Sequence, residues 1–356
     1  MDAVDVALVD FSEPAPKLTA TSSTAWPPAL RERLQTFAAG APIDATTFAI
    51  LDVEVGSFLA VAVNQLLRAN AIDSRQITAI GCHGQTVAHA PDAHPAATLQ
   101  LGDANIIVEY TGITTINDFR RRDLAAGGQG APLAPAFHEA QLRCDAEDRV
   151  VLNLGGIANI TVLPMDPGQP ACGFDTGPAN CLMDLWARRH LGRPYDEDGA
   201  WGAAASPEPD LLADLLDDPF FERRPPKSTG TQHFSSAWLD RKLAGAESLA
   251  PPRVQSTLAA LTCQTVSDAV RRFAPGTARV LVCGGGARNS ALLRLLSDSL
   301  GLPVESTQHF GIDPDWMEAM AFAWLAQRTL SHQAGNLPAV TGASGPRILG
   351  AVHPAG

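Results

Sequence analysis

The sequence lacks paired cysteines, a signal-like opening and long apolar runs. Its six cysteines lie far apart, and none forms a C-x-x-C pair, which indicates reduced, mostly buried thiols. No basic segment followed by an apolar stretch opens the sequence, and no uninterrupted run reaches the roughly 18 apolar residues of a membrane span. We therefore expect a cytoplasmic protein with no membrane partner.

Long runs of positive charge are also missing. The formal net charge is -12, with 38 acidic and 26 basic residues, and the longest basic run is Arg120-Arg121-Arg122. This balance disfavours nucleic acid as a partner. An acidic protein can still bind phosphate locally through backbone N–H groups and a few placed cations.

Several familiar catalytic motifs are absent. The sequence contains no G-x-x-x-x-G-K-[ST], and the segment 284–289 lacks the last glycine of G-x-G-x-x-G, which disfavours P-loop nucleotidases and Rossmann dehydrogenases. No spacing of His, Cys, Asp or Glu suggests a zinc site, and no G-x-S-x-G or catalytic cysteine signature occurs. Any metal is therefore expected to be magnesium that arrives with a nucleotide.

What is present predicts an α/β fold in two domains. The chain has 356 residues, and a chain of this length is longer than one hydrophobic core usually supports. Of these residues, 46% are hydrophobic, enough to form buried cores. A polar break at 145–148 suggests domains 1–144 and 145–356, with the option that the final helix returns to the first domain. We expect strands at 4–10, 77–81, 98–102, 112–118, 149–154, 159–163, 172–175 and 278–283. We expect helices at 48–67, 132–142, 178–190, 254–273, 290–300 and 315–330. The stretch 12–28 is predicted as loop or hairpin, and 193–230 as an excursion over the surface or cleft.

Two glycine turns follow strands and end in asparagine. Gly155-Gly156 precedes Asn159, and Gly284-Gly285-Gly286 precedes Asn289. Glycines at such places let the backbone approach a phosphate, although tight turns alone would also use them. The repetition favours nucleotide binding. A third glycine-rich segment, 125–132, opens onto a helix whose N-terminus could attract an anion.

Polar side chains at predicted strand ends are the candidate site residues. Asp175 ends a strand just before a helix, where it could act as a catalytic carboxylate or cap that helix, and both interpretations stay open. His83 and Gln85 follow one strand, and Arg120 and Asp123 follow another. Each alone is explained by a buried histidine or a solvated charge. Glu318 begins an apolar helix, where an acid also suits the helix dipole.

The segments together resemble the anhydro-N-acetylmuramic acid kinase family over nearly the whole chain. The matching segments are G-C-H-G-Q-T (81–86), L-Q-L-G-D (99–103), D-F-R-R-R-D-L-A-A-G-G-Q-G-A-P-L (118–133), L-N-L-G-G-I-A-N (152–159), G-F-D-T-G-P-A-N (173–180), P-K-S-T-G (226–230), C-G-G-G-A-R-N (283–289), D-W-M-E-A-M-A-F-A-W-L-A (315–326) and T-G-A-S-G-P (341–346).

The resemblance implies a fold, a reaction and a setting. The fold would be two ribonuclease-H-like domains of the actin/hexokinase type around a central cleft, with ATP against the second domain. The reaction would convert 1,6-anhydro-N-acetylmuramic acid, ATP and water to N-acetylmuramic acid 6-phosphate and ADP, in peptidoglycan recycling. A homodimer is also a family-level expectation.

The resemblance also implies residue roles. Asp175 would be the general base that activates water. Arg120, Asp123 and Glu318 would hold the sugar, with His83 and Gln85 lining its pocket. The ATP-binding residues would be Asp2, Asn153, Gly155 and Gly156 at the phosphates and Gly284, Gly285 and Gly286 on the adenosine side, with Mg²⁺ carried by the ATP.

The start of the sequence departs from the family pattern. Relatives carry a first phosphate loop of the form G-x-M-S-G-T-S-x-D-G, whereas here Met1 precedes Asp2 and Ala3 stands where glycine is expected. We expect a misassigned start codon, with Asp2 as the surviving end of the loop. The alternative is an inactive sugar- or nucleotide-binding paralogue, which an intact Asp175 argues against. A kinase for another sugar or acyl group is disfavoured by the segments 118–123 and 173–180.

Overall fold

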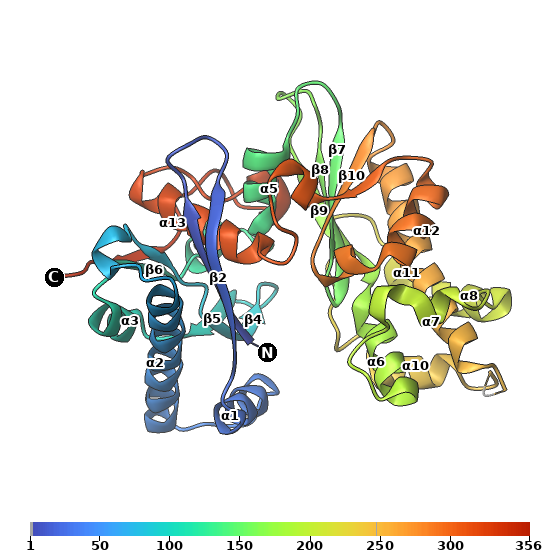
Figure 1. The fold of residues 1–356 in the computed structure, drawn as a ribbon, viewed down its shortest axis with the longest axis horizontal. Coiled ribbons are helices and arrows are strands. Elements are labelled where there is room, and N and C mark those ends of the chain that lie inside the picture. The colour runs from blue at the N-terminus through green and yellow to red at the C-terminus, as the bar shows by residue number, and fades with distance from the viewer. Residues whose placement is uncertain (1–2, 247) are drawn as a thin grey trace. The chain divides into compact units, whose positions relative to one another are not determined.

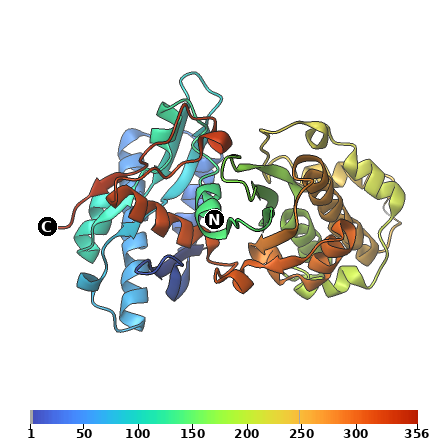
Figure 2. The same ribbon diagram turned by 90° about the horizontal axis from the view of Figure 1, so that it is seen from above.

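The computed structural model describes residues 3–246 and 248–356, and the chain forms two compact units. Met1–Phe137 and Glu318–Gly356 form unit 1, and His138–Met317 form unit 2. Unit 1 therefore contains both the blue N-terminal and the red C-terminal segments (Figures 1 and 2). The chain leaves unit 1 close to the predicted boundary at 144–145 and returns at Glu318. Asp2, which was assigned to ATP, lies outside the described residues.

Unit 1 combines two hairpins, a small sheet and several helices. Its strands are β1 (Ala3–Asp10), β2 (Lys17–Ala25), β3 (Ile80–Gly81), β4 (Gln85–Ala90), β5 (Ala97–Leu101), β6 (Thr115–Asn117) and β12 (Ala351–His353). Its helices are α1 (Pro28–Ala38), α2 (Ala45–Ala69), α3 (Ala104–Thr111), α4 (Arg121–Ala125), α5 (Ala134–Leu142, which continues into unit 2), α13 (Met317–Leu330), α14 (Pro338–Thr341) and the short 3-10 helix Ser74–Gln76. β1 pairs with β2, β4 pairs with β5, and β6 lies between β12 and β3. Because β12 pairs antiparallel with β6, the C-terminal segment belongs to unit 1.

Helix α2 is the long helix predicted at 48–67. The Asp44 side chain caps its first turn by accepting from Thr46 N at 2.9 Å and Thr47 N at 3.0 Å, as N-cap aspartates do. By length and composition alone α2 could cross a membrane. It buries Leu51 and Val55 in a core shared with the β1–β2 and β4–β5 hairpins. One face of α2 therefore packs in the core of unit 1, and a single helix of this length and composition is weak evidence for a membrane span.

Unit 2 is built on a five-stranded mixed sheet. Its strands are β7 (Arg149–Leu154), β8 (Ile157–Leu163), β9 (Cys172–Pro178), β10 (Arg279–Cys283) and β11 (Val304–Ser306). Its helices are α6 (Asn180–Leu191), α7 (Ala200–Ala203), α8 (Pro209–Leu216), α9 (Pro219–Glu222), α10 (Ser236–Lys242), α11 (Pro251–Phe273), α12 (Ser290–Leu300) and the 3-10 helices Glu197–Gly199, Gly285–Arg288 and Thr307–Phe310. The strand order is β11-β10-β7-β8-β9. β7, β8 and β9 form an antiparallel meander, while β10 and β11 run parallel to β7 (Figure 1). The α/β prediction is confirmed.

The local expectations meet different outcomes. The stretch 12–28 contains β2, the second strand of a hairpin, which confirms one of its two predicted forms. The segment 193–230 is not a surface excursion, because Leu211, Leu215 and Phe220 enter the core of unit 2. Strand β4 and helices α1 and α3 were not predicted. All six cysteines are free.

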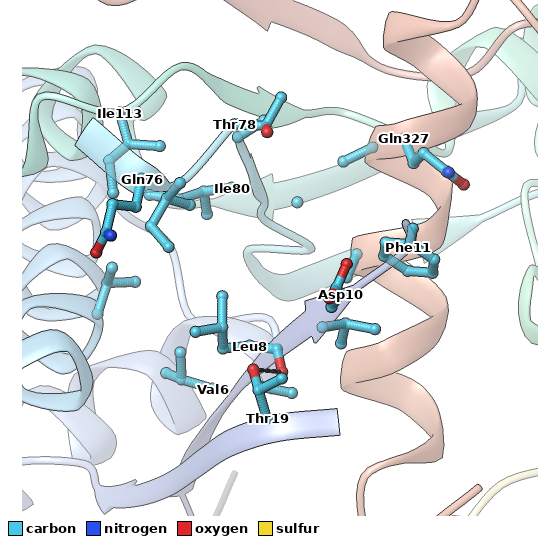
Figure 3. A pocket seen from close by; sticks show the side chains of 18 of the residues that line it. Val6, Leu8, Asp10, Phe11, Thr19, Gln76, Thr78, Ile80, Ile113 and Gln327 are labelled. Atoms are coloured by element: carbon cyan, nitrogen blue, oxygen red, sulfur yellow. Dashed lines mark hydrogen bonds between the residues drawn. The ribbon is translucent and has the colours of Figure 1, made fainter. Parts of the chain in front are cut away.

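Unit 1 also contains a cavity of about 650 Å³ between β1, the segment 76–81, α2 and α13 (Figure 3). Its walls are mostly apolar, with Val6, Leu8 and Ile80 from the strands and Leu66 from α2. None of the predicted site residues lines it. The predicted site residues lie instead at strand ends, outside this cavity.

Candidate active site

A row of polar residues crosses the sheet of unit 2. Asn153 on β7 lies opposite Asn159 on β8, and Asn159 lies opposite Asp175 on β9. On the other side Asn153 is in register with Cys283, the last residue of β10. Residues opposite each other in neighbouring strands share one face of a sheet. The register therefore brings Asp175 and Asn153 to one end of the sheet, together with the two glycine turns.

Asp175 is a half-buried carboxylate held by a neighbouring loop. Its backbone N–H donates to Lys227 O at 3.1 Å, and its Oδ2 accepts from Thr229 N at 2.9 Å. Burial raises the pKa of Asp175, although the Thr229 N–H and the charge of Lys227 act in the opposite direction. A carboxyl whose pKa is raised holds a proton more readily, which suits a general base.

The helix-cap interpretation of Asp175 is wrong. Helix α6 begins at Asn180, its N-cap residue is Ala179, and no side chain caps it. The first N–H groups of α6 are satisfied instead by the glycine turn: Ala179 N and Cys181 N donate to Gly156 O at 3.0 and 3.1 Å. The Asp175 carboxylate is therefore free for another use.

The second glycine turn packs against the end of β7, which leads into the first glycine turn. A Cβ atom at Gly284, whose φ is +79°, would lie 2.5 Å from Asn153 Oδ1, and one at Gly286 would lie 2.5 Å from Leu154 Cβ. Gly285 has more room, since its nearest such contact is 3.8 Å. Close packing thus accounts for Gly284 and Gly286.

Asn180 connects the two glycine turns. Its Nδ2 donates to Leu154 O at 2.8 Å, and its Oδ1 lies 3.2 Å from the position of a Cβ on Gly286. Sequence reasoning assigned no role to Asn180 or to Asn159, although both stand in the matched segments. Thr229 and Lys227 were missed in the same way within P-K-S-T-G. The sequence feature that could have pointed to all four residues was their position in the matched segments. Their contacts could be known only from the folded structure.

In unit 1 the structure brings His83 and Arg120 together. Arg120 Nε donates to His83 Nε2 at 3.1 Å, and Nη1 donates to Gly130 O at 2.8 Å. Burial, reinforced by the Arg120 charge, lowers the pKa of His83 to about 3. His83 is therefore neutral at physiological pH and accepts a hydrogen bond through Nε2, which leaves Nδ1 as its donor.

Helix α13 brings Phe322 and Glu318 to this pair. The His83 ring lies 4.5 Å from the Phe322 ring, and the α13 backbone packs so closely on Gly81 that a Cβ there would lie 2.2 Å from Phe322 O. Glu318 is exposed at the start of the helix. Burial lowers the pKa of Arg120, and the charge of Glu318 acts in the opposite direction. Gln85 opens β4, with its Nε2 donating to Thr86 O at 3.0 Å.

Asp123 differs from the other predicted sugar residues because it is fully buried. Its Oδ2 accepts from Gly130 N at 2.8 Å, and its Oδ1 accepts from Asn336 Nδ2 at 2.7 Å and Thr341 Oγ1 at 2.8 Å. The carboxylate therefore fixes the loop that also receives Arg120. In this conformation it offers no surface to a ligand.

The predicted residues thus gather in two sets. His83, Gln85, Arg120 and Glu318 belong to unit 1, and Asp175, Asn153 and the glycine turns belong to unit 2. Among residues 3–246 and 248–356 no three metal-ligating side chains cluster. A divalent ion brought by a nucleotide needs no such cluster.

Known proteins resemble this chain over almost its whole length. The family model for anhydro-N-acetylmuramic acid kinase matches residues 1–355. The enzyme of that name from Xanthomonas axonopodis pv. citri is 52% identical over 99% of this chain and 95% of its own length. Those from Xylella fastidiosa and Coxiella burnetii are 49% and 46% identical, each over 94% of its own length and 100% and 99% of this chain. A solved ROK-family glucokinase from Streptomyces griseus overlays with a TM-score of 0.37 at 14% identity, covering 91% of this chain and all of the glucokinase. That overlay is too weak to support an argument.

Proposed function

This chain belongs to the anhydro-N-acetylmuramic acid kinase family, and from that premise we propose that it phosphorylates 1,6-anhydro-N-acetylmuramic acid with ATP. Water opens the anhydro ring, and the products are N-acetylmuramic acid 6-phosphate and ADP. The family carries the two-domain α/β fold of the actin/hexokinase type. The comparisons support this kinase and not the inactive paralogue.

The observation that carries the proposal is the position of Asp175. A half-buried carboxylate of raised pKa stands in one row with Asn153 and beside two glycine turns. In the proposed reaction Asp175 takes a proton from water as the water oxygen attacks the anomeric carbon. The bond from that carbon to O6 breaks, and O6 accepts the γ-phosphoryl group as ADP leaves. Asp175 then returns its proton to solvent.

The sugar is assigned to the set in unit 1. Arg120 and Glu318 offer a cation and a carboxylate, while neutral His83 and Gln85 add hydrogen-bonding groups suited to sugar hydroxyls. Asp123 was predicted to hold the sugar as well. Because Asp123 is buried, we propose that it acts indirectly, by fixing the loop at Gly130 whose carbonyl accepts a hydrogen bond from Arg120.

ATP is assigned to the set in unit 2. Asn153 with Gly155 and Gly156 is proposed to face the phosphates, and the turn Gly284–Gly286 to face the adenosine. Magnesium bound to the phosphates would neutralise the charge that develops during transfer. The proposed setting is cytoplasmic peptidoglycan recycling, with a homodimer as the proposed assembly and no nucleic-acid or membrane partner.

The test is phosphoryl transfer from MgATP to the anhydro sugar, followed by ADP release and by detection of the 6-phosphate. We expect Asp175→Asn to lower kcat about 10³-fold, within the range of general-base catalysis. The matched control is Asp240→Asn, which removes an exposed carboxylate that pairs with Arg189. If only other sugars accept phosphate, the substrate is wrong; if Asp175→Asn keeps full kcat, the assigned base is wrong.

A further inference from the structure

The loop that holds the Asp175 carboxylate is itself held by a chain of side chains. Thr229 donates its backbone N–H to Asp175 Oδ2 at 2.9 Å, and within the described part of the chain Oδ1 accepts no hydrogen bond. The position of Thr229 therefore decides which oxygen remains available to a water molecule. Whatever fixes Thr229 also fixes the direction of the free oxygen.

His233 is the next member of this chain. Its Nδ1 lies 3.1 Å from Thr229 Oγ1, and its Nε2 lies 3.2 Å from Asp218 Oδ2. The ring stacks on Phe234, with centroids 4.4 Å apart and planes 8° apart. Both ring nitrogens are therefore engaged, and the ring plane is fixed by a buried aromatic neighbour.

Asp218 anchors the chain in the core. Its Oδ2 also accepts from Trp238 Nε1 at 2.9 Å, and its Oδ1 accepts from Phe220 N at 3.0 Å. Burial alone would raise the pKa of Asp218, but the hydrogen bonds from Phe220, Trp238 and His233 together hold the pKa below its ordinary value. Asp218 is then an acceptor only, so that Nε2 of His233 carries the proton. In this Nε2–H tautomer, Nδ1 of His233 accepts the hydroxyl proton of Thr229.

We propose that Asp218, His233 and Thr229 form a positioning chain for Asp175, in which His233 fixes the Thr229 hydroxyl and thereby the N–H that holds Oδ2. This proposal rests on the proposed function, since Asp175 is the assigned base. None of its three members needs to touch the substrate. They are positioning residues, and their loss should lower kcat with little effect on either KM.

The kinetic test uses two substitutions that each remove one hydrogen-bonding group of the positioning chain, and one substitution that restores such a group. His233→Ala removes the ring, and Thr229→Val removes only the hydroxyl; each should lower kcat about tenfold, since small misplacements of a catalytic group are costly. The double variant should also lose about tenfold, because residues in one network are not independent. His233→Asn, which offers an oxygen near the position of Nδ1, should recover much of the loss. Thermal melting checks that every variant is folded.

Three results would overturn the chain. One is an unchanged kcat in both single variants. A second is a double variant that loses about a hundredfold, which would mean that the two residues act independently. A third is a further loss when His233→Ala is added to Asp175→Asn, because a residue that acts through Asp175 has nothing left to position there.

A separate measurement distinguishes failure of the chain from failure of the proposed function. Nitrogen-15 NMR of the His233 ring should show the proton on Nε2 in the unaltered protein and lose that preference in Asp218→Asn. This readout needs no turnover. A protein with the Nε2–H tautomer but no kinase activity contradicts the proposed function alone, whereas a proton on Nδ1 contradicts the chain.

Discussion

The two units hold their functional side chains by different means. In unit 1, Arg120 contacts His83 and Gly130 through its side chain, and Asp123 ties three parts of the chain together. In unit 2, Asn153 and Asp175 are aligned by strand register, and only a loop contact holds the carboxylate. The first arrangement is a closed polar network, and the second is a row of side chains at one end of a sheet.

Because of this difference, we expect mutations in the two sets of residues to have different effects. A closed network of buried charges loses much stability when one member is removed, because its partners stay buried and unpaired. A side chain such as Asp175, which is only half-buried and is held by one loop contact, can change with a smaller effect on stability. We therefore expect substitutions in unit 1 to affect folding and sugar binding, and substitutions in unit 2 to affect the chemical step.

The largest expected effect is that of Asp123→Ala. It removes a fully buried carboxylate that accepts hydrogen bonds from Asn336, Thr341 and Gly130 N, and each buried donor left unpaired should cost about 1–3 kcal/mol of unfolding free energy. Urea denaturation measures this value. Asp92→Ala, at an exposed position, is the control and should change it by less than about 0.5 kcal/mol. Equal effects would show that unit 1 does not depend on this network.

Arg120→Lys should come next. A lysine cannot reach both His83 Nε2 and Gly130 O with a planar fork, so we expect the KM for the sugar to rise about tenfold or more while kcat changes little. Steady-state kinetics with the anhydro sugar varied at saturating ATP separates the two constants. A fall in kcat with an unchanged KM would place Arg120 in the chemical step. It would then be wrong to assign sugar binding to unit 1 and the chemical step to unit 2.

A matched pair of glycines tests the packing of the two turns in unit 2. Gly284→Ala places a Cβ 2.5 Å from Asn153 Oδ1 at a φ of +79°, and we expect a loss of about 1–3 kcal/mol together with a higher KM for ATP. Gly285→Ala meets its nearest contact at 3.8 Å and has no positive φ. It should leave stability nearly unchanged. If Gly285→Ala alone raises the KM for ATP, the nucleotide approaches that backbone directly.

The smallest expected effect concerns stability and pH. Burial raises the pKa of Asp175 in the folded protein, with Thr229 and Lys227 opposing it, so the folded state binds the proton more tightly than the unfolded state. The resulting stabilisation is present at pH values below the ordinary pKa of aspartate and is lost as pH rises through the folded pKa. At neutral pH, Asp175→Asn should therefore be slightly more stable than the unaltered protein. That difference should shrink on acidification in urea melts at several pH values, and a less stable variant at pH 7 would contradict it.

Much of the fold follows from local sequence patterns. Alternating residues predicted β1, and apolar runs before glycines predicted β7 and β10, because period and turn chemistry are local properties. Strand β3 is shorter than predicted and β4 was missed, since pairing partners decide how far such short strands extend. The segment 193–230 reached the core because α8 and α9 find apolar partners distant in sequence.

The sequence alone predicted which residues are candidates for the chemistry, since a carboxylate after a strand and glycines at turns are visible in the order of residues. Only the tertiary structure decided what each one does. Asp123 meets partners 213 and 218 positions away, and these contacts bury a residue that the sequence predicted to hold the sugar. The row from Asn153 to Asp175 depends on register, and the contact from Asp218 to His233 depends on how two loops pack. Such contacts are long-range or geometric, and no local pattern encodes them.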